Sequence, residues 1–211
     1  ESGSLMTNTA SISGGGVDVD DSASFMMTGG EIKTNEANSG GGGVYAHSGT
    51  FTLSDIASIE SNTAKGRNGG GIYVDSTGKL VIKGGSIKLN MATKTTGGVG
   101  NGGGVYVYGS TATFTMKDSA VVTPSLEENT DSKKFNDVYL DSSAKITVND
   151  PLSPSGGKAA RITVPYGSYS ESTKVLAGTD EAIGKNYKKF EVTRGGTPLK
   201  DWEVDSTGKL K

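Results

Sequence analysis

The sequence has no cysteine among its 211 residues, so disulfide bridges, thiolate metal sites and a cysteine nucleophile are excluded. A chain without cysteine is typical of an intracellular protein or of a protein that a bacterium exports. Histidine and tryptophan occur once each, and all five prolines lie beyond residue 120. No apolar run approaches the ~18 residues of a membrane helix, so we expect no direct membrane insertion of this segment.

The chain also lacks an excess of charge of either sign. Its 21 basic and 23 acidic residues give a formal net charge of −2. Binding to nucleic acid or to an anionic membrane needs a concentrated basic surface. We therefore expect no nucleic-acid partner.

Glycine is abundant, with 33 residues, roughly twice its usual share, whereas only 33% of the residues are hydrophobic. This composition is typical of a disordered chain, a collagen-like fibre or a solenoid with tight turns. Collagen is excluded because glycine does not recur at every third position. Disorder is excluded because the apolar residues, although sparse, follow a repeating pattern.

The repeat begins with a glycine triplet and a β-branched residue, and triplets start at residues 14, 41, 69 and 102. A fifth unit, residues 136–140, keeps the strand pattern without the glycines. Three short segments with alternating apolar residues follow in the same order in each unit. The first segment comprises residues 44–46, 72–74 and 105–107. The second comprises residues 25–27, 51–53, 80–82 and 114–116. The third is centred on Ile32, Ile59, Ile87 and Val121 or Val122.

Alternation with a period of two predicts strands with one buried face. The turns between the strands are too short for crossover helices, so an ordinary parallel sheet is excluded and no helix is expected. The sequence predicts an all-β fold, a right-handed parallel β-helix whose strands pair with their copies in the next coil. We expect about five coils in residues 1–148 and a less regular C-terminal cap of the same elongated domain in residues 149–211.

The heptapeptide Val-Asp-Ser-Thr-Gly-Lys-Leu occurs twice, at residues 74–80 and 204–210. It is interpreted as one corner of a coil, with the valine and the leucine pointing inward. Its second copy predicts that solenoid geometry continues to the C-terminus, through strand-like segments at 161–164, 173–176, 190–193 and 202–204. Trp202 is expected in the plug that covers the last coil. Residues 1–13 resemble part of an earlier coil, so we expect a longer repeat protein.

Two ladders of polar residues support this register. Asn35, Asn62 and Asn90 each follow an inward isoleucine by three residues, and stacked amides can bond from coil to coil. A second ladder, with alternating charge, is expected on the outside and comprises Lys33, Glu60 and Lys88.

None of the possible catalytic or metal-binding motifs is convincing. Residues 98–103 match G-x-G-x-x-G, but a strand is expected to follow where a phosphate loop needs a helix. Asp18, Asp20 and Asp21 do not fit a calcium nonapeptide and are interpreted as solvated corner residues. His47 has no evident nucleophile beside it. We expect no catalytic residue, metal site or cofactor.

The most suggestive set of residues is aromatic. One outward position of four consecutive coils is occupied by Tyr45, Tyr73, Tyr106 and Tyr139, which we call the tyrosine row. In the predicted register the rings lie ~5 Å apart along one face. They either only stabilise the stacked strands or form a binding strip for a glycan or a protein. Both interpretations stay open.

The motifs Gly-Gly-Gly-Val-Tyr-Val, Phe-Thr-Met and Gly-Gly-Ser-Ile-Lys resemble glycine-rich β-helix repeats of bacterial cell-surface proteins. The chain looks most like repeat-bearing surface lipoproteins of spirochaetes, including its ending around 189–192, 202–204 and 208–210. It is more distantly similar to chlamydial polymorphic outer-membrane repeats, from which it departs at Ser54 and Lys117. The resemblance implies export and often adhesion, and it carries no catalytic residues.

These observations predict a non-catalytic structural or adhesive solenoid at a bacterial cell surface, which contacts host or matrix proteins or glycans through the tyrosine row. One alternative is a carbohydrate-active enzyme, a polysaccharide lyase or hydrolase on a β-helix. Such an enzyme needs converging carboxylates, and the three arginines and the acids are dispersed along the chain. The other alternative is a purely mechanical surface spacer.

Overall fold

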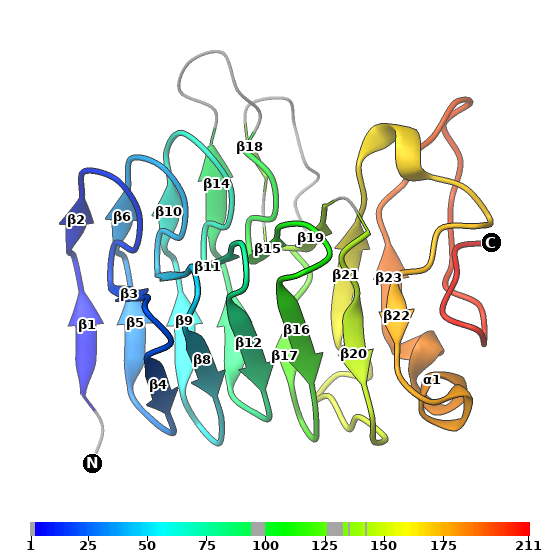
Figure 1. Cartoon of the computed structure of the whole chain (residues 1–211), viewed down its shortest axis with the longest axis horizontal. Helices are drawn as coiled ribbons and strands as arrows, with labels where there is room; N and C mark the ends of the chain where they lie inside the picture. Colours follow the sequence, from blue (N-terminus) through cyan, green and yellow to red (C-terminus); the bar gives the residue numbers. More distant parts are fainter. Residues whose placement is uncertain (1–2, 94–99, 126–132, 135, 142) are drawn as a thin grey trace.

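The chain winds into a stack of coils that runs from the N-terminus at one end of the molecule to the C-terminal segment at the other (Figure 1). The computed structural model describes residues 3–93, 100–125, 133–134, 136–141 and 143–211. Strands of successive coils pair in parallel, with β14 and β18 as the antiparallel exception among the named pairs. The predicted parallel β-helix is confirmed.

Two sheets, A and B, are built from the first strands of the coils. Sheet A has the order β1 (Ser4–Met6), β5 (Glu31–Lys33), β9 (Ser58–Glu60), β13 (Ser86–Lys88) and β17 (Val121–Val122). Sheet B has the order β2 (Thr9–Ala10), β6 (Glu36–Ala37), β10 (Thr63–Ala64), β14 (Met91–Thr93) and β18 (Lys133–Lys134).

Two further sheets, C and D, continue to the C-terminal part of the chain. Sheet C has the order β3 (Val17–Val19), β7 (Val44–Ala46), β11 (Ile72–Val74), β15 (Val105–Val107), β19 (Val138–Leu140), β21 (Ala160–Thr163) and β23 (Phe190–Val192). Sheet D has the order β4 (Ser24–Met27), β8 (Thr50–Leu53), β12 (Lys79–Ile82), β16 (Thr113–Met116), β20 (Ile146–Val148) and β22 (Leu176–Ala177).

The three predicted segments of each unit are the strands of sheets C, D and A, and their predicted register is confirmed. Ile32, Ile59 and Ile87 pair in sheet A, and Val122 rather than Val121 faces Ile87. The prediction of three strands per unit is wrong, because the strands of sheet B form a fourth side in the regular coils. The short sequence Asn-x-Ala produces this side, with the alanine buried against the interior.

The interior is filled by alternate side chains of the strands. In β8, Phe51 and Leu53 are buried while Thr50 and Thr52 are partly exposed. The aromatic rings of Phe25 and Phe51 stack with their centroids 5.7 Å apart. Burying a large apolar side chain contributes about 1.5–3 kcal/mol, so a few inward residues per coil hold the stack.

The glycine triplets make the corner between sheets B and C. The first glycine of each has a left-handed backbone, as at Gly41 (φ 66°) and Gly69 (φ 68°), which residues with a Cβ rarely adopt. The second approaches the sheet B strand closely: a Cβ at Gly70 would lie 2.3 Å from the carbonyl of Met91. The triplets are therefore required by backbone packing.

The predicted asparagine ladder is confirmed, and it is longer than expected. The side-chain amide of Asn62 donates to Oδ1 of Asn90 (3.0 Å) and accepts from Nδ2 of Asn35 (3.0 Å). Asn8 begins the ladder and Asn136 continues it beyond Asn90. Each interior amide also donates to a carbonyl of the preceding coil, as Asn62 does to Ile32 (2.9 Å). Buried polar groups are thus satisfied from coil to coil.

The predicted ladder of alternating charge is also confirmed. The carboxylate of Glu60 lies 3.7 Å from Nζ of Lys33 and 3.3 Å from Nζ of Lys88. Both lysine side chains are substantially exposed. Solvent-exposed ion pairs contribute at most about 1 kcal/mol, so this ladder adds little to stability.

The C-terminal end differs from the prediction in two ways. A helix is present, α1 (Asp180–Asn186), with short 3₁₀ turns η1 (Tyr166–Ser168) and η2 (Tyr187–Lys189) nearby. Thr179 caps α1 by accepting a hydrogen bond from the amide of Ala182 (3.2 Å).

No described helix has the length and apolar character needed to cross a membrane.

The second heptapeptide copy does not form another parallel coil. Val204 and Leu210 pair with each other in an antiparallel bridge, and Lys209 forms an antiparallel bridge with Lys174 beside sheet D. The first copy instead connects β11 of sheet C to β12 of sheet D. The two copies share the hydrogen bond that closes the turn, because Gly78 and Gly208 donate to the carbonyls of Asp75 and Asp205. The backbone of the turn differs, since the left-handed residue is Ser76 in the first copy and Gly208 in the second. The same corner sequence therefore ends the stack as a hairpin.

Candidate functional site

The tyrosine row lies along the outer face of sheet C. Each of its residues is the central residue of a strand, and Tyr73 is in register with Tyr45 and Tyr106. Tyr139 follows Tyr106 in the next coil. Asp18 takes this position in the first coil, in register with Tyr45. The predicted alignment of the four residues is confirmed.

The rings contact one another at about the expected spacing, but they do not form a flat strip. The centroid distances along the row are 5.3, 4.9 and 5.4 Å. The pairs Tyr45–Tyr73 and Tyr73–Tyr106 are edge-on, with interplanar angles of 73° and 86°, whereas Tyr106 and Tyr139 stack at 13°. Such pairs contribute about 0.5–1.5 kcal/mol each beyond their buried area.

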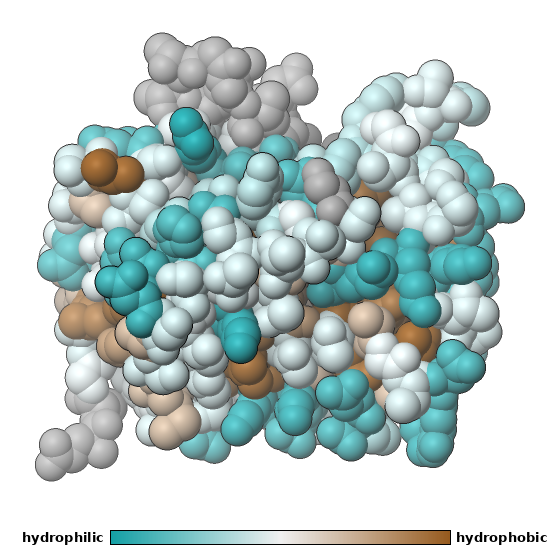
Figure 2. Space-filling model, viewed as in Figure 1, coloured by the Kyte–Doolittle hydropathy of each residue, from teal (hydrophilic) through white to brown (hydrophobic). Residues whose placement is uncertain are grey.

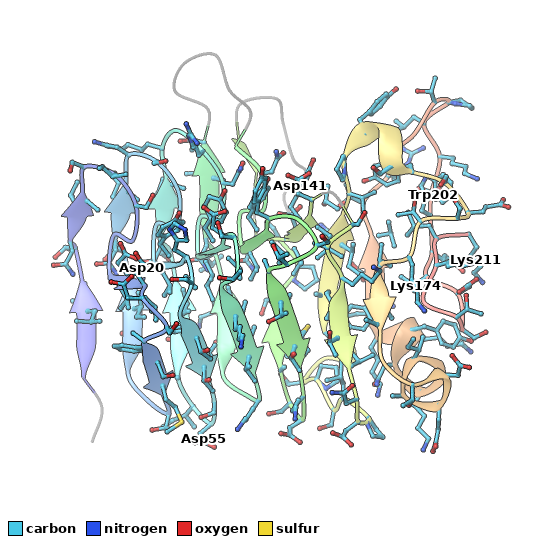
Figure 3. The ribbon with its side chains drawn as sticks, in the orientation of Figure 1. Asp20, Asp55, Asp141, Lys174, Trp202 and Lys211 are labelled. Atoms are coloured by element: carbon cyan, nitrogen blue, oxygen red, sulfur yellow. The ribbon has the colours of Figure 1, made fainter. Side chains whose placement is uncertain are left out.

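Two of the tyrosines join their coil to the next one through an aspartate. The hydroxyl of Tyr45 donates to Oδ2 of Asp75 (2.6 Å), and that of Tyr106 donates to Oδ2 of Asp141 (2.6 Å). Both aspartates directly follow a sheet C strand, and Figure 3 shows Asp141 at such a corner. Tyr73 has no equivalent contact, because Tyr108 occupies this corner after β15.

The row is less open than an exposed strip would be. Tyr106 is only 4% exposed, and Tyr45, Tyr73 and Tyr139 are half-buried. The turn before β7 covers part of Tyr73, since a Cβ at Gly40 would lie 2.3 Å from Cδ1 of that ring. The solvated part of the row belongs to these three half-buried tyrosines, and the nearby Tyr108 is 47% exposed.

Burial gives the tyrosine row a measurable pH dependence. It raises the pKa of all four hydroxyls, that of Tyr139 to about 12, and the neighbouring aspartates raise them further. An unfolded tyrosine has a pKa of about 10. Because the folded pKa values are the higher ones, the row's contribution to stability is complete below pH ~10 and is lost as the pH rises toward 12 and beyond.

We therefore expect tyrosinate absorbance from the row to appear late in an alkaline titration, together with a fall in the unfolding midpoint. Titrating the Tyr106→Phe variant provides the control, because it removes the most buried of the four hydroxyls. Complete ionisation of all eight tyrosines near pH 10 in the folded protein would contradict this description of the row.

The acidic residues and the histidine of the first coils lie near the row but do not form a site. His47 packs edge-on against Tyr45, with centroids 5.8 Å apart. Oδ1 of Asp20 accepts from the hydroxyl of Ser48 (2.6 Å). Asp20 and Asp21 are exposed and follow β3, in agreement with the predicted solvated corner. Asp18 is also exposed, but it lies in the middle of β3 and not at the corner, so the prediction is wrong for this residue. Among the described residues, no group of three or more possible metal ligands comes together.

The G-x-G-x-x-G match is only partly described, because Gly98 and Val99 lie outside the described residues. The strand expected after it is present as β15. The end of the match is the fourth glycine triplet, with Gly102 in the left-handed region (φ 63°). A phosphate loop needs a helix at this point, so this segment serves as a coil corner.

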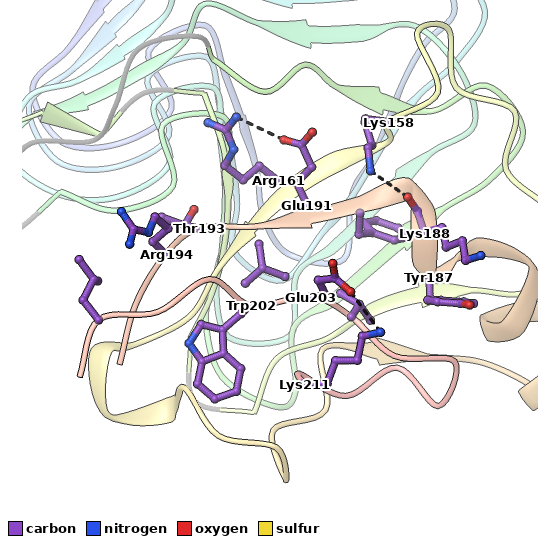
Figure 4. Close-up of a pocket in the computed structure, with 14 residues that line it drawn as sticks. Lys158, Arg161, Tyr187, Lys188, Glu191, Thr193, Arg194, Trp202, Glu203 and Lys211 are labelled. Atoms are coloured by element: carbon purple, nitrogen blue, oxygen red, sulfur yellow. Dashed lines mark hydrogen bonds and ion pairs between the residues drawn. The ribbon is translucent and has the colours of Figure 1, made fainter. Parts of the chain in front are cut away.

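A second surface, the C-terminal hollow, lies beside the free edge of β23 (Figure 4). Its volume is about 1120 Å³. Its lining includes two ion pairs between neighbouring residues of paired segments, Arg161 with Glu191 (3.3 Å) and Lys211 with Glu203 (3.1 Å). The sequence gives no indication of this hollow, because its residues come from β21, β23 and the C-terminal hairpin without a shared motif.

Trp202 lies in the wall of this hollow, at the C-terminal end of the molecule (Figure 3). It is 7% exposed, and its indole Nε1 donates to the carbonyl of Gly195 (3.0 Å). Nζ of Lys200 lies 3.8 Å from the ring centroid, and Tyr169 packs at 5.9 Å. The prediction that Trp202 belongs to the terminal plug is confirmed.

Comparisons with protein-family models, curated proteins and solved structures found no match to this chain. The similarity to bacterial surface repeats therefore stays a prediction. The tyrosine row and the C-terminal hollow are the two surfaces from which a function can be inferred. Both combine aromatic rings with neighbouring charged groups, and both are held by strands of sheet C.

Proposed function

We propose that the chain is a non-catalytic structural and adhesive solenoid that is exported to a bacterial cell surface. The observation that carries the structural part is that polar groups connect one coil to the next. The asparagine ladder, the Tyr45–Asp75 hydrogen bond and the Lys33–Glu60 ion pair all do so. Such a stack holds an outer face at fixed spacing over its whole length.

The adhesive part is supported by the aromatic character of the outer face of sheet C. Tyr45, Tyr73 and Tyr139 are partly in contact with solvent, and the exposed Tyr108 lies near them. Tyrosine combines an apolar ring with a polar hydroxyl and is enriched in binding surfaces. The partners that fit this surface are glycans and host or matrix proteins.

The carbohydrate-active alternative needs two carboxylates that are free to act on one bond. Glu191 and Glu203, the two carboxylates that line the C-terminal hollow, are each engaged by a cation, Arg161 and Lys211. This pairing favours the non-catalytic proposal. A mechanical spacer has the same architecture, and only a retained ligand distinguishes an adhesin from it.

We expect the purified chain to bind at least one ligand on panels of immobilised glycans and extracellular-matrix proteins. Replacing Tyr73→Ser and Tyr139→Ser together should weaken this binding about tenfold or more, because truncating aromatic contact residues commonly costs over 1 kcal/mol. These positions are chosen because neither hydroxyl makes one of the hydrogen bonds to Asp75 or Asp141.

The matched control is Tyr166→Ser, which removes a 68% exposed tyrosine outside the row. A double variant, Lys158→Ala with Lys188→Ala, tests the C-terminal hollow separately. Thermal unfolding shows whether each variant is folded. The absence of any retained ligand would overturn the adhesive proposal in favour of a spacer, and release of oligosaccharides from a polysaccharide would favour the enzyme.

A further inference from the structure

We infer that the N-terminal end of the solenoid is a stacking surface for one further β-helical coil that carries an asparagine at the ladder position and a glycine triplet at the next corner. The surface is formed by the outer edges of β1, β2, β3 and β4. Each of these strands is the last of its sheet and pairs on one side only. Unpaired edges of this kind are templates for strand addition.

The first coil exposes apolar side chains at positions that are buried in every later coil. Leu5 is in register with Ile32, yet Leu5 is 40% exposed and Ile32 has no exposed area. Phe25 is likewise partly exposed, whereas Phe51 beside it is fully buried. Figure 2 shows apolar surface at this end of the molecule. A coil in register over the first one would complete the burial.

The asparagine ladder determines the direction in which a partner can stack. Oδ1 of Asn35 accepts from the backbone amide and from Nδ2 of Asn8, at 3.0 and 2.9 Å. In the next coil, the backbone amide and Nδ2 of Asn35 donate in the same way to Oδ1 of Asn62. The donors to each Oδ1 thus come from the coil on its N-terminal side, while Nδ2 also donates back to a carbonyl of the preceding coil, as Asn35 does to Leu5. Oδ1 of Asn8 receives no described donor. A coil stacked in the same direction would supply this donor from an asparagine amide.

The glycine corners have the same polarity. The amides of Gly14 and Gly15 donate to the carbonyls of Gly40 and Gly41 in the second coil. The carbonyl of Gly14 is equivalent to the carbonyl of Gly41 in the next coil. Among the described residues, no amide donates to the Gly14 carbonyl. A triplet stacked in the same direction would supply this donor. Two separate polar rows therefore specify the same partner.

A second copy of the chain does not fit this surface. Two copies stacked head to head would place the Asn8 Oδ1 acceptors against each other. The opposite end of a copy offers no ladder donor, because Nδ2 of Asn136, the last asparagine of the ladder, donates to the carbonyls of Ile87 and Thr123. On the sheet D side Gly208 also accepts from the amides of Val175 and Leu176. The occupant that fits is a coil of the same class and direction, in continuity with the interfaces between the existing coils.

The register supplies a test. Ser4, Glu31 and Ser58 are equivalent positions, so residues 31–57 form one complete coil that can be fused directly before Ser4. We expect this fusion to raise the urea midpoint by on the order of 1 M, because each added coil contributes an interface. The substitution Asn35→Ala in the added copy alone should remove a large part of the gain.

Leu5→Glu gives an independent readout. It should change the midpoint of the unfused chain little, and it should cancel most of the gain in the fusion, where the carboxylate would be buried. A fusion with the added residues in shuffled order is the control. An unchanged midpoint for the fusion, or equal midpoints for the fusions with and without Asn35→Ala, would overturn the inference. Sedimentation showing a dimer of the unfused chain that the fusion dissociates would assign the surface to a second copy and overturn it as well.

Discussion

Gly70→Ala is expected to destabilise the protein by roughly 3–5 kcal/mol. The new Cβ would lie 2.3 Å from the backbone carbon and oxygen of Met91 and 2.5 Å from the carbonyl of Gly103. These are backbone atoms of two neighbouring segments, so no side-chain rotation relieves the overlap. Urea unfolding measures the loss.

The matched control adds the same methyl group where the backbone leaves space. Gly184 lies in α1, and a Cβ there would meet no atom within 4 Å. Gly184→Ala should stabilise the protein by about 0.5–1 kcal/mol, because alanine has the higher helix propensity. The two substitutions are thus predicted to have opposite signs. A Gly70→Ala variant as stable as the parent would show that the coils are not packed through the glycine corners.

Asn62→Ala is expected to cost about 3–5 kcal/mol, because it breaks the asparagine ladder in its fully buried centre. The backbone amide and Nδ2 of Asn35 would lose their shared acceptor. The carbonyl of Ile32 would lose its side-chain donor. Each buried group left without a partner costs about 1–3 kcal/mol.

Asn8→Ala is the corresponding control at the exposed start of the ladder. It removes only the bond from Nδ2 to Asn35, and the backbone amide of residue 8 still donates to the same oxygen. We expect a loss below about 1 kcal/mol. Equal effects of the two substitutions would mean that solvent, and not the ladder, satisfies these amides.

Much of the fold follows from the sequence because matching positions in successive coils become neighbours. The glycine triplets, the row from Tyr45 to Tyr139 and the isoleucines of sheet A recur at spacings that fix one register. The ladders of Asn62 and Glu60 follow from that same register. Long repeats therefore give a reliable prediction of which residues lie side by side.

The fourth side of the coil was not predictable by alternation, because its strands are only two or three residues long. The alanine that points inward, as at Ala37 and Ala64, is too small to stand out as a core residue. The recurring Asn-x-Ala sequence was the available signal. The glycine corner approaches the backbone of the residue before this alanine, as Gly42 does at Thr63.

The C-terminal end departs from the prediction because the repeat no longer constrains it. Thr179 followed by Asp180 and Glu181 is an ordinary sequence signal for the start of a helix. The helix was not predicted because the repeat pattern led us to expect strands throughout the chain. The second heptapeptide keeps the closing hydrogen bond of its turn, but the left-handed residue moves from the position of Ser76 to Gly208, and the pairing partner changes. Identical local sequence produces a turn in both places, and the neighbouring segments determine its conformation and what it pairs with.

The tyrosine row shows how far a candidate site can be predicted. Its alignment follows from the repeat, and its edge-on packing and its bonds to Asp75 and Asp141 depend on side-chain geometry. The C-terminal hollow depends entirely on how the hairpin closes over β23, which no sequence spacing encodes.

The central claim is that equivalent residues of successive coils lie on a line at the spacing of paired strands. Met26 and Ala177 are connected in sheet D through Thr52, Val81, Thr115 and Thr147, which makes five steps. Because the chain has no cysteine, Met26→Cys and Ala177→Cys accept spin labels at these two positions alone. Pulsed electron paramagnetic resonance should give one narrow distance near 24 Å, about 4.8 Å for each step. A broad distribution, or a distance beyond about 40 Å, would contradict the stacked coil.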